Sequence, residues 1–167
     1  MRVVEWSPEL SVGVEVLDFD HEVLVSLINQ LADAVADGED HDVVGSVLNM
    51  MLDYTDYHFG REEAIMEACA YPGLAEHRAI HAALKGRVRE IRDLYDANPG
   101  MVLGEDLMDF LTRWLKDHIM GRDRLYIPSL RGKEMTIAAS SQDFDATQPL
   151  VSDAIDDDQD FLFEGKA

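Results

Sequence analysis

Apolar residues recur at steps of three and four in four segments of the chain, which is the spacing of amphipathic α-helices. The first segment begins at Asp18 and stops near Gly38, and the second reaches a Tyr-Pro-Gly break at 71–73. The third spans about 74–98, and the fourth follows the turn ANPGM. Short connections favour antiparallel neighbours. The pattern therefore predicts an all-α protein, an antiparallel up-down-up-down four-helix bundle.

Both ends of the chain lack this pattern. Residues 1–17 contain Pro8 and Gly13, so we expect an extended N-terminal arm anchored by Trp6. Beyond Leu130 the sequence is polar and acidic. We therefore divide the chain into a bundle, 1–131, and an acidic C-terminal tail, 132–167, which is either flexible or docks on the bundle or a partner. The tail holds apolar residues among its acids: Leu150, Val151, Ile155, Phe161, Leu162 and Phe163.

Polar residues with metal-binding chemistry interrupt the apolar stripes. A lone histidine such as His21 on an apolar stripe is more often a hydrogen-bonded core residue than a ligand. His58 and Glu62 are four residues apart, as are His77 and His81, so each pair shares one helical face. Two imidazoles so placed can bind one metal ion. An ionised Glu62 that faces the core needs a cation to offset its burial.

The fourth segment adds His118 and, five residues later, Asp123. An ideal helix would turn about 140° between them, so if both face the core the helix must distort, and Gly121 favours a π-type bulge there. All four segments then supply inward ligands, and seven nitrogen and oxygen donors exceed the needs of one tetrahedral zinc ion but suit two octahedral-type ions that share carboxylates. The predicted ligands are His21, His58, Glu62, His77, His81, His118 and Asp123.

Composition narrows the possible partners. A net charge of −20 over 167 residues argues against nucleic acid and against an anionic membrane surface. The single cysteine, Cys69, excludes an internal disulfide framework and fits a reducing compartment. With neither a signal peptide nor a membrane-spanning apolar run in the sequence, we expect a cytoplasmic protein. The sequence also lacks a glycine-rich phosphate loop and a nucleophile elbow.

Over residues 4–130 the sequence resembles the hemerythrin family, in particular its single-domain bacterial members. The resemblance rests on ordered motifs: W-S at 6–7, D-x-x-H at 18–21, H-F-x-x-E-E at 58–63, Y-P-G followed by H-x-x-x-H, and W-L-x-x-H-I-x-x-x-D at 114–123. Each motif is weak alone, but their order and spacing are specific.

The resemblance implies a non-haem di-iron centre with an oxo or hydroxo bridge that binds dioxygen reversibly. One iron would be held by His77, His81 and His118. The other would be held by His21 and His58 and would keep an open position for dioxygen, with Glu62 and Asp123 bridging the pair. By helical offset from these ligands, we expect the apolar walls of an oxygen pocket to be Leu24, Val25, Ile28, Leu111, Trp114, Leu115 and Ile119.

For three further polar residues we expect positions outside the ligand set. Asp20 stands where the family commonly has glutamine, and we expect it to alter only the charge at the edge of the site. Glu63 should point about 100° away from Glu62 and remain a surface residue, and His41 should have no role in the site.

The leading hypothesis is a non-enzymatic protein that binds dioxygen for storage, delivery or protection of oxygen-sensitive enzymes. One alternative is an oxygen or redox sensor that signals to a protein partner through the tail. The other is a di-iron enzyme that acts on nitric oxide or peroxide.

Overall fold

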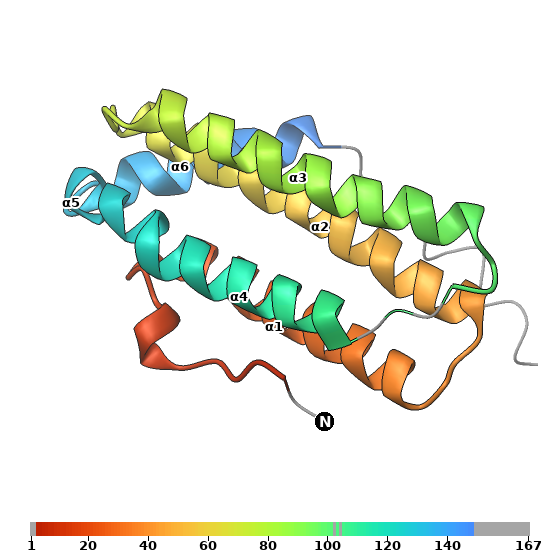
Figure 1. The fold of residues 1–167 in the computed structure, drawn as a ribbon. Helices are drawn as coiled ribbons and strands as arrows, with labels where there is room; N and C mark the ends of the chain where they lie inside the picture. The colour runs from red at the N-terminus through yellow and green to blue at the C-terminus, as the bar shows by residue number, and fades with distance from the viewer. Residues whose placement is uncertain (1–2, 102, 104, 149–167) are drawn as a thin grey trace, which may run out of the picture.

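The computed structural model describes residues 3–101, 103 and 105–148, and within these residues it contains helices and no strand. The predicted all-α four-helix bundle is confirmed (Figure 1). The helices are α1 (Glu15–Ala36), α2 (His41–Ala68), α3 (Leu74–Ala97), α4 (Glu105–Gly121), α5 (Ile127–Leu130) and α6 (Glu134–Thr147), with 3-10 turns η1 (Pro8–Leu10) and η2 (Asp123–Tyr126).

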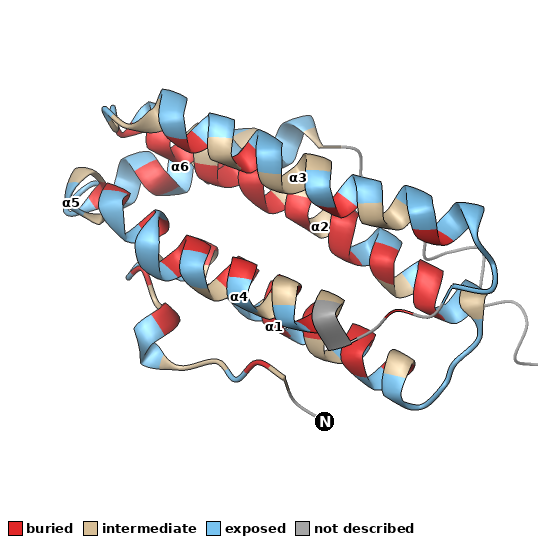
Figure 2. Cartoon of the chain, viewed as in Figure 1, coloured by how far each residue is buried: buried red, intermediate tan, exposed pale blue. Residues whose placement is uncertain are grey.

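The four long helices run alternately up and down (Figure 1), and each turns its buried face toward the others (Figure 2). α1 packs against α2 and α4, and α2 also packs against α3. α1 ends where Gly38 adopts φ +70°, a conformation that glycine takes without strain. α2 begins three residues later, at His41, because the side chain of Asp40 accepts a hydrogen bond from the Val43 amide at 3.0 Å and caps the helix. This short turn makes the two helices antiparallel neighbours.

The N-terminal arm lies along the bundle, as predicted. Val4 is buried, and its backbone exchanges hydrogen bonds with the Asn29 side chain of α1. Asp18 of α1 accepts hydrogen bonds from the Ser11 hydroxyl at 2.6 Å and the Val12 amide at 2.7 Å. Trp6 is half-buried against the apolar core. The arm is therefore fixed by side chains of α1.

Part of the segment assigned to the acidic tail is helical. α6 packs against the outer face of α2, where Phe144 covers Gly60 so closely that a Cβ on this glycine would meet the ring at 2.9 Å. The apolar residues that the sequence singled out in the tail, from Leu150 to Phe163, lie outside the described residues. None of the described helices is long and apolar enough to cross a membrane.

Candidate metal centre

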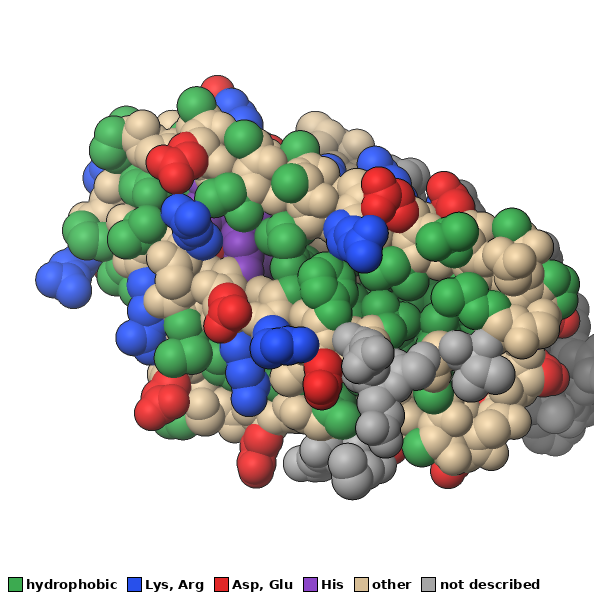
Figure 3. All heavy atoms as spheres, in the orientation of Figure 1, with side chains coloured by type: hydrophobic (Ala, Val, Ile, Leu, Met, Phe, Trp, Pro, Cys, Tyr) green, Lys and Arg blue, Asp and Glu red, His purple; other side chains and the backbone are tan. Residues whose placement is uncertain are grey.

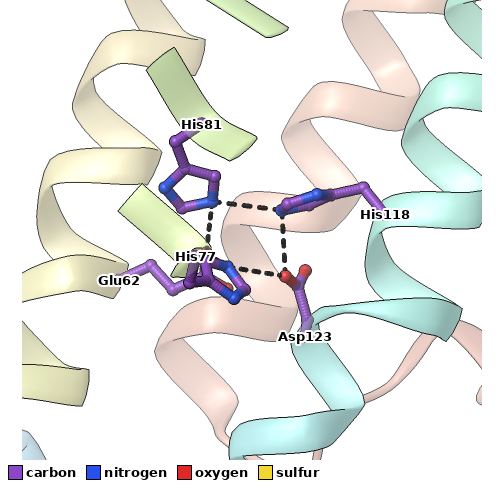
Figure 4. Close-up of side chains that lie close together, drawn as sticks. All are labelled: Glu62, His77, His81, His118 and Asp123. Atoms are coloured by element: carbon purple, nitrogen blue, oxygen red, sulfur yellow. Dashed lines mark hydrogen bonds and ion pairs between the residues drawn. The ribbon is translucent and has the colours of Figure 1, made fainter. Parts of the chain in front are cut away.

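The seven predicted ligands lie together in the interior of the bundle, and Figure 4 shows five of them. All seven are buried, although each is polar. They form two groups, within each of which the ligand atoms lie within 4.8 Å of one another. One group comprises Glu62, His77, His81, His118 and Asp123, and the other comprises His21, His58 and Glu62.

Glu62 belongs to both groups because its two oxygens face different histidines. Its Oε2 lies 3.4 Å from Nε2 of His77 and 3.1 Å from Nε2 of His81. Its Oε1 lies 4.0 Å from Nε2 of His58. The carboxylate therefore stands between the two groups of imidazoles.

Asp123 repeats this arrangement from the other side. Its Oδ1 lies 3.3 Å from Nε2 of His77 and 3.0 Å from Nε2 of His118, and its Oδ2 lies 3.3 Å from Nε2 of His21. Figure 4 shows Asp123 facing His77 and His118 from below the end of α4. Two carboxylates, each with one oxygen toward each histidine group, are arranged as bridging ligands would be.

The chain brings Asp123 inward by ending α4, and the predicted π-type bulge was wrong. The Arg122 amide still donates to the His118 carbonyl at 2.8 Å, with ordinary α-helical spacing. The helix stops after Gly121, and Asp123 opens the 3-10 turn η2. Because the turn redirects the backbone, His118 and Asp123 reach the same site without widening the helix.

The spacing of the donor atoms fits bound metal ions. Ions of the first transition row bind nitrogen and oxygen at about 2.0 to 2.2 Å, so neighbouring ligands at right angles stand about 3 Å apart. The contacts of Glu62 and Asp123 with four of the histidines are 3.0 to 3.4 Å long. Nε2 of His81 and Nε2 of His118 are 3.1 Å apart, which is close enough for both to bind one ion.

Several of these atoms lack a hydrogen-bond partner among the described residues. They are Oε2 of Glu62, both carboxylate oxygens of Asp123, and Nε2 of His21 and of His77. Buried polar atoms without partners are costly, whereas bound cations, one at each histidine group, would satisfy them. The buried set of imidazoles and carboxylates therefore fits a non-haem di-iron site.

Without metal, protons take the place of the cations. Burial and the charge of Asp123 raise the pKa of Glu62, but the close contacts of its Oε2 with His77 and His81 outweigh these effects and hold the pKa below its usual range. Burial also raises the pKa of Asp123, but the charge of His118, whose Nε2 lies 3.0 Å from Oδ1 of Asp123, helps to keep that pKa low. Burial lowers the pKa of His77, yet Asp123 and Glu62 raise it to about 9. Metal binding must therefore displace protons.

Asp20 is part of the site, and its prediction as an edge residue was wrong. It is 0% exposed, and its Oδ2 accepts a hydrogen bond from Nδ1 of His58 at 3.1 Å. Its Oδ1 accepts from the Tyr54 hydroxyl at 2.8 Å and from Nη1 of Arg61 at 3.2 Å. A carboxylate on the outer nitrogen fixes the tautomer of a ligating histidine. Asp20 thus turns Nε2 of His58 toward Glu62.

Glu63 has the same role on the other side of the site, so its prediction as a surface residue was also wrong. Its Oε1 accepts a hydrogen bond from Nδ1 of His81 at 2.8 Å, and its Oε2 lies 3.4 Å from Nε of Arg78. The side chain is 23% exposed. His41, by contrast, lies outside the site as expected, and its Nε2 contacts the Tyr95 carbonyl at 2.8 Å.

Sequence reasoning missed two aromatic residues at the site. The fully buried Tyr126 of η2 donates a hydrogen bond from its hydroxyl to Oε1 of Glu62 at 2.6 Å. The ring of Phe59 stacks on the imidazole of His81, with centroids 3.6 Å apart and planes 1° from parallel. Phe59 directly follows His58, so only its position inside the motif pointed to it.

Known proteins share these features. The family model of the hemerythrin HHE cation binding domain matches residues 12–130. The chain belongs to the hemerythrin family. It is 36% identical over 131 residues to a bacteriohemerythrin of Pseudomonas aeruginosa, covering 78% of this chain and 84% of that protein. A bacteriohemerythrin of Methylococcus capsulatus is 30% identical over 131 residues, with coverage of 78% and 98%.

A solved structure of wild-type hemerythrin agrees with the fold. It superimposes with a TM-score of 0.72 at 29% identity and covers 77% of this chain and 98% of that one. The hemerythrin-family match ends at residue 130, so α6 lies beyond it.

The seven residues predicted to line an oxygen pocket are all buried on α1 and α4, within the apolar core. Figure 3 shows histidine side chains at the floor of a hollow between α3 and α4.

Proposed function

We propose that this protein binds dioxygen reversibly at a non-haem di-iron centre held by the seven buried ligands. The observation that carries the proposal is the pair of buried carboxylates, Glu62 and Asp123, each facing both histidine groups. A single ion would face only one histidine group and would leave one oxygen of Asp123 buried without a partner among the described residues. Two ions use all four oxygens.

The ligand set is unequal on the two sides. His77, His81 and His118 with the two carboxylates offer one ion five protein ligands, whereas His21 and His58 with the same carboxylates offer the other four. An octahedral ion has more room on the two-histidine side, so we assign dioxygen to that side. Two ferrous ions, when bound, supply the electrons that reversible dioxygen binding needs.

Side chains of this protein favour binding over oxidation of a substrate. Five neutral imidazoles place less negative charge on the metals than a carboxylate-rich site would, and we infer that this restrains the stabilisation of high-valent iron. The pocket walls, which we assign to Leu24, Val25, Ile28, Leu111, Trp114, Leu115 and Ile119, exclude water and protons. The hydroxyl of Tyr126 holds Oε1 of Glu62 in place. These features suit storage, delivery or protection in the cytoplasm better than catalysis.

The test is anaerobic loading of the metal-free protein with ferrous iron, followed by exposure to air. We expect two irons per chain and a new visible absorption band that disappears when oxygen is removed. The His58→Ala variant should lose the band, whereas His41→Ala, which changes a histidine outside the site, should keep it. One iron per chain, or a band that bleaches irreversibly, would contradict the proposal.

A further inference from the structure

α6 is joined to the candidate metal centre although it lies beyond the family match. Asp145 of α6 uses Oδ1 to accept hydrogen bonds from the Tyr57 hydroxyl at 2.7 Å and from Nη2 of Arg61 at 3.0 Å. Both donors belong to α2, the helix that carries His58 and Glu62. The contact therefore connects the C-terminal helix to a helix that supplies ligands.

Arg61 carries this contact into the interior. It is 7% exposed, and while Nη2 binds Asp145, Nη1 lies 3.2 Å from Oδ1 of Asp20. The other oxygen of Asp20 accepts the hydrogen bond from Nδ1 of His58. One continuous series of charged and hydrogen-bonded groups therefore runs from Asp145 through Arg61 and Asp20 to His58.

Packing fixes the outer end of this series. The ring of Phe144, which precedes Asp145, lies against Gly60, where a larger residue would collide with it. It also packs on the ring of Tyr57, with centroids 5.6 Å apart. The guanidinium of Arg61 stands 4.5 Å from the centre of that same ring. The packing of Phe144 and Arg61 on Tyr57 thus keeps Asp145 next to Arg61.

Charge explains what the arrangement does. One guanidinium is shared between two carboxylates, and Asp20 is fully buried, so its interaction with Arg61 is poorly screened. If Asp145 lost its charge, Arg61 would pair more fully with Asp20. Asp20 would then be a weaker acceptor for the Nδ1 proton of His58, and Nε2 would donate less electron density. Outer partners tune ligating histidines in this way.

We propose that Asp145 is a positioning residue for His58, acting through Arg61 and Asp20, so that α6 adjusts the metal ion on the two-histidine side. The proposal rests on the proposed function only in taking His58 as a ligand. The three-histidine side is connected differently, since His81 leads to Glu63 and Arg78 on α2 and α3. An effect of α6 should therefore appear at His58 and not at His81.

The first experiment uses metal-free protein labelled with nitrogen-15 at histidine, so that it does not depend on iron. In Asp145→Asn, the Nδ1 proton resonance of His58 should move to lower chemical shift, because its hydrogen bond weakens, while that of His81 stays in place. Asp143→Asn is the matched control, since it removes the same charge from an exposed position on the same helix. It should move neither resonance.

The second experiment measures the reduction potential of the iron-loaded protein. The potential should rise in Asp145→Asn because weaker donation from His58 stabilises ferric iron less, and it should return toward the wild-type value in Asp145→Glu. The proposal is overturned if Asp145→Asn matches Asp143→Asn in both measurements, or if the His58 and His81 resonances move together, which would indicate general loosening. A shift at His58 in a protein that binds no iron would instead refute the proposed function alone.

Discussion

The two histidine groups use the same ligand chemistry but are supported by different surroundings. On the three-histidine side, His81 binds Glu63, which is 23% exposed and pairs with the half-exposed Arg78. On the two-histidine side, His58 binds Asp20, whose side chain is 0% exposed and pairs with the Arg61 side chain, which is 8% exposed. Exposed ion pairs contribute little and are screened by salt. Breaking a buried pair is costly because it leaves an uncompensated charge.

This difference means that the two sides should respond unequally to substitution. Water can replace Glu63 as the partner of His81, because the side chain already reaches the solvent. Water has no comparable access to Asp20, which is enclosed by Tyr54, Arg61 and His58. The side that we assign to dioxygen is thus also the side whose support is the more rigid.

The largest effect should come from removing a shared carboxylate, because both histidine groups then lose a ligand. Glu62→Ala should lower iron binding by more than about a hundredfold, since even an outer partner of a ligand contributes about ten- to a hundredfold. We expect the iron content to fall from two per chain toward zero, as measured by metal analysis after gel filtration.

The matched control is the neighbouring residue. From the sequence, Glu63→Ala should leave oxygen binding nearly intact, but the hydrogen bond to His81 changes this expectation to a partial loss of about tenfold. If both substitutions removed the same amount of iron, Glu62 would not be the shared ligand.

The bundle and its inward ligands could be predicted because they depend on local spacing. Stripes of apolar residues at three- and four-residue steps define the helices, and His58 with Glu62, or His77 with His81, share a face by helical geometry alone. The Tyr-Pro-Gly break marks the turn between α2 and α3. Each of these signals lies within a single helix or turn.

The outer contacts could not be predicted because they join residues far apart in the sequence. Asp20 and His58 are separated by 38 positions, and Tyr126 and Glu62 by 64. Whether these pairs meet depends on how the helices cross, which periodicity does not encode. α6 escaped prediction for a related reason. Its sequence has few large apolar residues, and it is fixed on α2 by contacts between distant residues, such as Phe144 with Gly60 and Asp145 with Arg61.

The stability of the metal-free protein should depend on pH, and histidines of the two sides should contribute unequally to that dependence. The pKa of His77 is raised to about 9 by Asp123 and Glu62. A raised pKa stabilises the folded state fully below the unfolded value near 6.5, and the benefit is lost as the pH rises through about 9. The free energy of unfolding in urea should therefore fall by about 3 kcal/mol over this interval, since one pKa unit corresponds to about 1.4 kcal/mol.

Variants of His77 and His21 test which histidine group causes this change in the free energy of unfolding. His77 contacts both carboxylates, whereas His21 contacts only Asp123 at a distance within 3.4 Å. His77→Gln should therefore flatten the pH profile more than His21→Gln. A profile that rises from pH 6.5 to 9 in the metal-free protein would show that the histidines do not hold protons for the carboxylates.

The smallest and most selective effect should come from the two outer carboxylates. Asp20→Asn keeps an oxygen that can accept from His58 but removes the charge that Arg61 faces. We expect it to weaken metal binding by about ten- to a hundredfold, whereas Glu63→Gln should cost less than about tenfold. Competition with a chromophoric chelator, using cobalt as a redox-stable probe, measures the loss of metal affinity in both variants on one scale.

The two losses should differ in their dependence on salt. A higher salt concentration should make the loss of affinity in Glu63→Gln smaller and leave the loss in Asp20→Asn unchanged, because only the exposed ion pair is screened. Equal losses with equal salt dependence would mean that burial does not distinguish the two sides, and the rigid support that we assign to the two-histidine side would have no energetic basis.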